Sequence, residues 1–193
     1  MTVFTLSQLP NIITVLRILL VVPTVWLLWE THYVFALTIM TTAGLSDALD
    51  GWMARKFNWM SRFGAAMDPV ADKLLVAATF VVFTVQGHIP LWVAIIVLGR
   101  DAIIMTGAGV YRLWFETIEF APTFVSKANT ATQMVMLLLL LLSLCGFGVV
   151  SSVAGALVDP YCFYLLAALG IVSGLDYIVT WGYRAWRNAR NSA

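Results

Sequence analysis

The chain has 193 residues, of which 61% are hydrophobic and only 11% are charged. An average soluble domain carries about 25% charged residues, so this composition excludes an ordinary soluble enzyme and predicts an integral membrane protein. The net charge of +1 provides no general field that would attract nucleic acid. No nucleic-acid, flavin or dinucleotide motif is present in the sequence either.

Six apolar segments approach the length of about 20 residues that a membrane-spanning helix needs. They cover residues 11–29, 34–56, 65–86, 90–114, 125–147 and 160–184. The breakers between them are Glu30 to His32, Asn58 to Gly64, Gly87 to Pro90, Glu116 to Pro122 and Gly148 to Pro160. The first ten residues contain no Lys or Arg, so no cleavable signal is evident and we expect the first segment to stay. We therefore expect an all-α integral membrane protein, a six-helix transmembrane bundle that forms one domain over residues 1–193.

The basic residues predict how this bundle is oriented. The connections between segments 1 and 2, 3 and 4, and 5 and 6 contain no Lys or Arg, whereas Arg62 lies between segments 2 and 3. Arg184, Arg187 and Arg190 lie at the C-terminal end. By the positive-inside rule both termini and the second connection are cytoplasmic. We expect a multi-pass protein of a bacterial cytoplasmic membrane.

Four aspartates lie where the second segment ends and the third begins. Asp47 and Asp50 are three residues apart, and Asp68 and Asp72 are four apart. On helices these spacings put each pair on one face. Carboxylates inside a membrane are costly, and divalent cations, which prefer oxygen ligands, would offset that cost. The pattern predicts a metal site.

Small residues and an arginine accompany the first pair of aspartates. Gly51 and Ala54 leave room for a ligand close to the backbone. Arg55 is a planar donor suited to phosphate. Carboxylates, small residues and a base together point to a site that handles phosphate.

Two other classes of protein could carry such charges. A purely structural membrane subunit could pair the carboxylates with Arg55, Lys56, Arg62 and Lys73. A small ion channel or transporter could also place carboxylates within a bundle. That class gives no role to the small residues of the pattern or to Arg55.

The complete pattern is Asp47-x2-Asp50-Gly51-x2-Ala54-Arg55-x8-Gly64-x3-Asp68-x3-Asp72. It resembles the signature of the CDP-alcohol phosphatidyltransferases at every defining position. The resemblance implies a six-helix fold, commonly a homodimer, that transfers a phosphatidyl group from a CDP-linked lipid to an alcohol and releases CMP. It also implies that the four aspartates hold one or two ions of Mg²⁺ or Mn²⁺ and that Asp72 is the general base. The CDP moiety would lie against Gly51, Ala54, Arg55 and Gly64.

The first segment begins with a polar stripe. Asn11, Thr14 and Arg17 follow one another at intervals of three residues on an otherwise apolar helix. Family members that use CDP-diacylglycerol often begin this way, which implies that Asn11 and Thr14 lie beside the CDP group and Arg17 toward the acceptor. The alternative is a helix cap followed by an interfacial arginine.

The later segments bear on the acceptor alcohol. Enzymes of the family that use glycerol 3-phosphate carry extra cations where this chain has Ala108 and Asn129. The stretches around Arg100-Asp101, Tyr111-Arg112 and 122–133 resemble the cardiolipin synthases, whose acceptor is phosphatidylglycerol. This resemblance implies acceptor binding by Arg17, Arg100, Arg112, Lys127 and Asn129, with phosphatidylglycerol as the favoured acceptor and glycerol 3-phosphate as the alternative. An ion pair with another helix remains open for Arg100 and Asp101, and a snorkelling position at a helix start remains open for Lys127.

Overall fold

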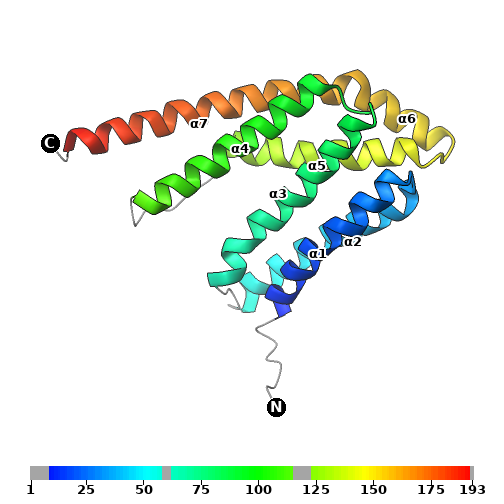
Figure 1. Ribbon diagram of the computed structural model, residues 1–193, viewed down its shortest axis with the longest axis horizontal. Helices are drawn as coiled ribbons and strands as arrows, with labels where there is room; N and C mark the ends of the chain where they lie inside the picture. Colours follow the sequence, from blue (N-terminus) through cyan, green and yellow to red (C-terminus); the bar gives the residue numbers. More distant parts are fainter. Residues whose placement is uncertain (1–8, 58–61, 115–122, 192–193) are drawn as a thin grey trace, which may run out of the picture. The chain divides into compact units, whose positions relative to one another are not determined.

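The computed structural model describes residues 9–57, 62–114 and 123–191, and Figure 1 shows the chain. Side chains are described for residues 13–46, 49, 53, 56, 70–71, 73–107, 123–177 and 179. The regular elements in these ranges are all helices: α1 (Leu9–Trp29), α2 (Tyr33–Phe57), α3 (Arg62–Val85), α4 (Leu91–Trp114), α5 (Phe124–Leu144), α6 (Val149–Leu157), η2 (Val158–Cys162) and α7 (Phe163–Asn191). The predicted all-α class is confirmed.

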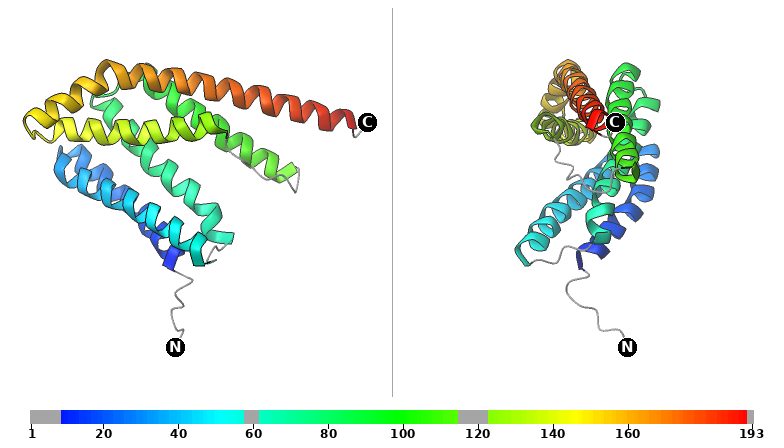
Figure 2. Two further views of the ribbon diagram at one scale, coloured as in Figure 1. Left: turned by 180° about the vertical axis from the view of Figure 1, so that it is seen from behind. Right: turned by 90° about the vertical axis from the view of Figure 1, so that its left-hand side faces the viewer.

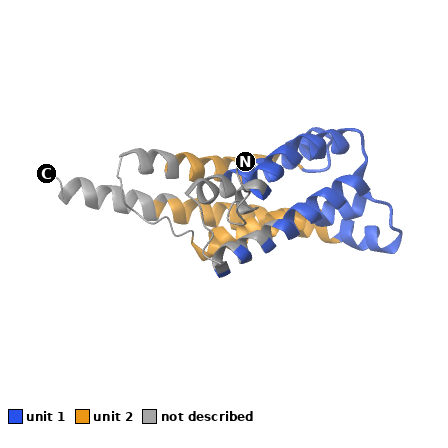
Figure 3. Cartoon of the chain, turned by 90° about the horizontal axis from the view of Figure 1, so that it is seen from below, with its two compact units in different colours: residues 1–89, 137–156 blue, residues 90–136, 157–193 orange. Residues whose placement is uncertain are grey.

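The chain divides into two compact units, which Figure 3 distinguishes by colour. Unit 1 comprises Met1–Ile89 and Leu137–Ala156, and unit 2 comprises Pro90–Met136 and Leu157–Ala193. The boundary between the units falls within α5, so its first half belongs to unit 2. The single domain over residues 1–193 stays a prediction.

Unit 1 is organised around α1, which packs against both α2 and α3 (Figures 1 and 2). Val21 of α1, Ala43 of α2 and Leu75 of α3 form a buried cluster. A tight turn joins α1 to α2, and Thr31 adopts a positive φ of 59° there. At the same end of the unit, Gln86 Nε2 donates a hydrogen bond of 2.8 Å to the Leu28 carbonyl.

Unit 2 is built on the packing of α4 against α7 (Figure 1). Two glycines allow these helices to approach closely. A Cβ atom on Gly170 would lie 2.9 Å from Ile96 Cγ2, and one on Gly107 would lie 2.8 Å from the Tyr177 hydroxyl. A larger residue at Gly170 or Gly107 would force the side chain of Ile96 or Tyr177 to shift.

The last part of the chain differs from the prediction. Residues 148–160 were expected to connect two helices, but Val149–Leu157 form α6. Glycine and proline in the stretch suggested a connection, although its other residues are small and apolar and pack well in a helix. Proline does break the helix, because the residue before a proline is disfavoured in helical geometry. Asp159 accordingly has φ −108° and ψ 117°, and α7 begins at Phe163.

Two described stretches are long and apolar enough to cross a membrane, judged by length and composition alone: Phe124–Leu144 and Val149–Tyr177, and the second includes the break at Asp159. The apolar stretches Ile13–Trp29, Tyr33–Ser46 and Lys73–Val85 are shorter. Large apolar side chains also lie on the outside of the helices. Val22 is 73% exposed and Val179 is 69% exposed. Such a surface suits lipid contact and suggests membrane association; six membrane spans stay a prediction.

Candidate active site

The four aspartates occupy the ends of α2 and α3 that are joined in the chain. Asp47 and Asp50 lie in the C-terminal part of α2, and Asp68 and Asp72 lie in the first turns of α3. Their side chains, like those of Gly51, Ala54, Arg55 and Gly64, lie outside the described residues. The helical backbone at these positions supports the periodicity that puts each aspartate pair on one face.

The core of unit 1 shows how far along the helix axes the aspartate positions lie relative to the residues of α1. Val21, Ala43 and Leu75 belong to one cluster. The N-terminal end of α1, the C-terminal end of α2 and the N-terminal end of α3 lie at the same end of the three-helix group (Figures 1 and 2). Toward that end, Arg17 lies one turn from the cluster residue of α1, and Asp47 lies one turn from that of α2. Asp72 lies about one turn from the cluster residue of α3. Arg17 therefore lies at the level of the aspartate motif.

Arg17 belongs to the buried face of α1. Thr14 and Arg17 are 0% and 3% exposed, and they continue the buried stripe of Val21, Thr24 and Leu28. An interfacial arginine would be exposed, so this burial argues against that alternative for Arg17. A guanidinium stays charged in proteins, and burial of a charge requires compensation. Arg17 thus puts a fixed positive charge at the end of unit 1 that carries the four aspartates. The side chain of Asn11 lies outside the described residues.

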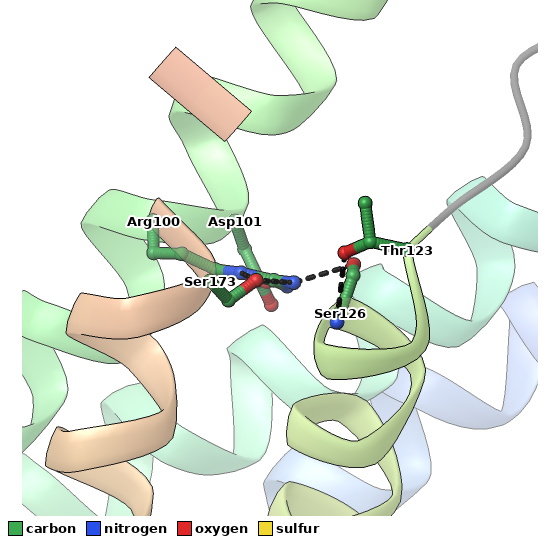
Figure 4. Close-up of polar contacts among 5 residues, drawn as sticks. All are labelled: Arg100, Asp101, Thr123, Ser126 and Ser173. Atoms are coloured by element: carbon green, nitrogen blue, oxygen red, sulfur yellow. Dashed lines mark hydrogen bonds and ion pairs between the residues drawn. The ribbon is translucent and has the colours of Figure 1, made fainter. Parts of the chain in front are cut away.

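Unit 2 contains a second polar group, the Arg100 cluster, which consists of Arg100, Asp101, Ser126 and Ser173 (Figure 4). Arg100 Nη1 contacts Asp101 Oδ1 at 2.6 Å, and Nη2 donates to Ser126 Oγ at 2.5 Å and to Ser173 Oγ at 2.6 Å. Nε also donates to Ser173 Oγ, at 3.1 Å. The cluster therefore links α4 to α5 and to α7.

The ion pair that the structure describes in this cluster joins two neighbours of the same helix. Among the described residues, Arg100 pairs with Asp101, its neighbour in α4, and an ion pair with another helix stays open. Both side chains are buried, with exposed fractions of 5% and 8% for the two residues. The links to other helices come from the hydroxyls of Ser126 and Ser173. Sequence reasoning missed Ser173, because a single serine in an apolar helix is too common to indicate a contact.

The remaining acceptor candidates lie in α4 and α5. Lys127 is exposed, whereas Asn129 is completely buried. Gln133, one turn after Asn129, is also completely buried, and sequence reasoning did not select it. The side chain of Arg112 lies outside the described residues. The role of these residues in acceptor binding stays a prediction.

Metal ligands can be sought only where side chains are described. Among those residues, no group of three or more His, Cys, Asp or Glu side chains could hold a metal ion. The four aspartates of the motif are not among them. Carboxylate oxygens are the donors that Mg²⁺ and Mn²⁺ prefer, so the donor set fits the predicted ions.

Comparison with known proteins decides the family. Residues 7–181 match the family described as CDP-alcohol phosphatidyltransferase. The chain belongs to the CDP-alcohol phosphatidyltransferase family. Its members are phosphotransferases that use a CDP-alcohol donor with lipid or glycerol acceptors and generally a divalent metal. The family resemblance of the aspartate motif is confirmed.

Relatives of this CDP-alcohol phosphatidyltransferase carry two kinds of name. Cardiolipin synthase (CMP-forming) from Homo sapiens is 32% identical over 144 residues, which are 66% of this chain and 48% of the human protein. The protein of that name from Streptomyces coelicolor is 33% identical over 155 residues, 76% of this chain and 70% of the relative. CDP-diacylglycerol–glycerol-3-phosphate 3-phosphatidyltransferase from Pseudomonas fluorescens is 35% identical over 146 residues, 69% of this chain and 72% of the relative.

The match spans less than half of the human protein, and 31% of a cardiolipin synthase–hydrolase fusion protein from Schizosaccharomyces pombe. Both kinds of relative are similar to the chain at nearly the same identity. The names therefore confirm the branch of the family and leave both acceptors open.

Proposed function

We propose that this protein transfers a phosphatidyl group from CDP-diacylglycerol to a glycerol-type alcohol and releases CMP, as a step in the synthesis of anionic phospholipids. The observation that carries the proposal is the buried Arg17 at the level of the aspartate motif in unit 1. A fixed cation beside four carboxylate positions suits a site that binds both metal ions and phosphates. Membership of the family supplies the donor class.

The aspartates are the proposed metal ligands. One or two ions of Mg²⁺ or Mn²⁺ would be held by Asp47, Asp50, Asp68 and Asp72. Bound there, the ions would polarise the pyrophosphate and stabilise the leaving CMP. Their positive charge would also compensate four carboxylates that are costly near a membrane.

The residues of the motif also have proposed roles in proton transfer, phosphate binding and nucleotide binding. Asp72 takes the proton of the attacking hydroxyl as general base. The acceptor oxygen then forms a bond to the phosphorus of the phosphatidyl group while the bond from that phosphorus to the CMP oxygen breaks. Arg55 neutralises phosphate oxygens. The nucleotide lies against Asn11 and Thr14 at the start of α1. The small residues Gly51, Ala54 and Gly64 of the motif leave space for it.

Phosphatidylglycerol is the acceptor that we favour, which makes the activity that of a cardiolipin synthase. A phosphomonoester such as glycerol 3-phosphate carries nearly two negative charges and would need more cations than a phosphodiester. Asn129 is neutral and completely buried. The guanidinium of Arg100 is already bonded to Asp101, Ser126 and Ser173. Arg17, Arg112 and Lys127 would supply the charge that the diester needs.

Glycerol 3-phosphate is the alternative acceptor. The 35% identity to the enzyme from Pseudomonas fluorescens that is named for this acceptor favours it. Under this alternative Arg17, Arg100, Arg112 and Lys127 together suffice to bind a phosphomonoester.

The proposed setting is a homodimer in a bacterial cytoplasmic membrane, with six spans per chain. Both termini and the active site face the cytoplasm, where a water-soluble nucleotide can leave. The basic residues of the second connection and of the C-terminal end support this orientation.

An acceptor competition tests the proposal. Purified protein receives labelled CDP-diacylglycerol and Mg²⁺ or Mn²⁺, with phosphatidylglycerol or glycerol 3-phosphate in separate reactions. We expect cardiolipin from phosphatidylglycerol and no product from glycerol 3-phosphate. Phosphatidylglycerophosphate as the sole product would overturn the favoured acceptor and keep the transferase activity.

A further inference from the structure

Two side chains in the first half of α5 form a buried amide pair. Asn129 and Gln133 lie one turn apart, and both are 0% exposed. Their side-chain nitrogen and oxygen atoms have no hydrogen-bond partner in the part of the chain that the structure describes. Met136, Leu137 and Leu140 continue the same buried face of the helix.

Unpartnered amides are unusual inside a protein. Nearly all buried polar groups make hydrogen bonds, because desolvation without a partner is costly. Leucine, of similar size to Gln or Asn, would fit the apolar face of α5 at no such cost. The amide pair therefore weakens unit 2 as it stands, and a cost of this kind marks a residue kept for a ligand.

The chemistry of the pair selects the class of ligand. Each amide offers an NH₂ donor and a carbonyl acceptor and carries no charge. Hydroxyl groups both donate and accept, so two neighbouring hydroxyls can satisfy both amides. A phosphate offers acceptors only and would leave the two amide carbonyls unsatisfied.

Charged groups lie near the N-terminal end of α5, on the side from which the amide pair begins. Ser126 precedes Asn129 by three residues and accepts a hydrogen bond from Arg100 Nη2 (Figure 4). Lys127 next to it is exposed. A ligand that carries both hydroxyls and a phosphate would thus find cations near the start of α5 and neutral amides one to two turns further along.

We propose that Asn129 and Gln133 bind the neighbouring hydroxyls of a glycerol unit. This inference rests on the proposed function and names the part of the acceptor that the enzyme reads in unit 2. The head group of phosphatidylglycerol and free glycerol 3-phosphate both present such a diol. Phosphatidic acid has the phosphate and lacks the diol.

Binding without the CDP donor tests the site, because no turnover is needed. The probes are short-chain phosphatidylglycerol, glycerol 3-phosphate and short-chain phosphatidic acid, each titrated into the purified full chain in detergent. Ligand affinity comes from calorimetry, and the melting temperature of the ligand-free protein is recorded beside it. The variants are Gln133→Leu and Asn129→Leu, with Gln86→Leu as the matched control because Gln86 bonds to the Leu28 carbonyl in unit 1.

We expect the wild type to bind at least one diol ligand and phosphatidic acid more weakly. Gln133→Leu and Asn129→Leu each weaken diol binding about tenfold or more and leave the ligand-free melting temperature unchanged or higher. Gln86→Leu lowers the melting temperature and keeps the affinity. Binding of phosphatidylglycerol alone identifies a lipid source for the diol, and binding of glycerol 3-phosphate identifies a soluble source.

Three results would overturn the inference. The first is that the wild type binds neither diol ligand, and the second is that it binds phosphatidic acid as tightly as phosphatidylglycerol. The third is that Gln133→Leu and Asn129→Leu lower the melting temperature and keep diol affinity, which is the result expected if a buried water satisfies the amides. Asp72→Asn separates this inference from the proposed function, because it should abolish CMP release and retain Gln133-dependent diol binding. Diol binding with no CMP release from the wild type would overturn the proposed function alone.

Discussion

At the scale of single residues, the surroundings of two buried arginines differ. Arg17 and Arg100 each lie in an apolar segment, and both are almost completely buried. Arg100 uses its guanidinium to link α4, α5 and α7. Arg17 instead lies at the level of the aspartate motif in unit 1. We therefore propose that Arg17 belongs to the active site and that Arg100 serves first as a structural link.

His88, in the turn between α3 and α4, makes a prediction about pH. Its Nε2 lies 3.3 Å from the Tyr33 hydroxyl, and its ring packs edge-on against Phe83. Burial lowers the pKa of His88 below its ordinary value of 6.5. The unfolded chain then binds a proton more readily than the folded one, so His88 stabilises the fold above pH 6.5 and this contribution is lost as the pH falls toward the folded pKa.

We expect the melting temperature of the wild type to fall between pH 7.5 and pH 5.5, a range that brackets the ordinary histidine pKa of about 6.5. His88→Gln, which can still accept a hydrogen bond from Tyr33, should reduce that slope. His32→Gln is the control, because His32 is exposed. Equal slopes for the wild type and His88→Gln would contradict the assignment.

At the scale of helices, the Arg100 cluster is the link that we expect to matter most for stability in unit 2. Arg100→Met removes the cation that contacts Asp101 at 2.6 Å within a buried cluster. Loss of one partner of a buried ion pair costs about 3–5 kcal/mol. Replacement of both partners by apolar residues is often close to neutral. We expect Arg100→Met to be strongly destabilising and the double variant Arg100→Met/Asp101→Leu to recover most of the loss.

The free energy of unfolding in detergent, measured as a double-mutant cycle, checks this expectation. Lys127→Met is the control for removal of a cation, because Lys127 is exposed and the change should stay within about 0.5 kcal/mol. If the double variant were as unstable as Arg100→Met, the ion pair would not explain the effect.

Sequence reasoning predicted most helices of this chain and not their contacts. Long apolar segments between charged or glycine- and proline-containing breakers gave α1 to α5 close to their observed bounds. The helix α6 was not predicted, because Gly148 and Pro160 indicated a connection while residues 149–157 between them are helical. A breaker shows where a helix ends and says little about the residues between two breakers.

The candidate site divides in the same way. The aspartate motif is local in sequence, so its residue types and spacing predicted a site for metal and phosphate, and its resemblance to the family signature implied the transferase chemistry. The partners of Arg100 are 26 and 73 residues away, and a serine in an apolar helix is too common to predict such a contact. Gln133 became a candidate only through its burial without a partner, which a sequence does not record.

At the scale of the whole molecule, six spans with both termini on the cytoplasmic side make a prediction about topology. The turn between α1 and α2 should then face the opposite side from the C-terminus. Single cysteines at Thr31, which is exposed, and at Ala193 test this in a background with Cys145→Ala and Cys162→Ala. In oriented vesicles, we expect an impermeant thiol reagent to label the two positions from opposite sides, and labelling of both from one side would contradict the six-span topology.

The central claim is that the aspartates catalyse transfer of a phosphatidyl group. The most direct test is the release of CMP from CDP-diacylglycerol by the purified protein, with phosphatidylglycerol and glycerol 3-phosphate both present. The wild type is compared with Asp72→Asn and with Asp159→Asn, which removes an exposed carboxylate outside the motif. We predict that CMP release requires Mg²⁺ or Mn²⁺, falls about 10²–10⁴-fold in Asp72→Asn and is unchanged in Asp159→Asn. CMP release that survives both a chelator and Asp72→Asn, or its absence in the wild type together with ion flux in vesicles, would contradict the account.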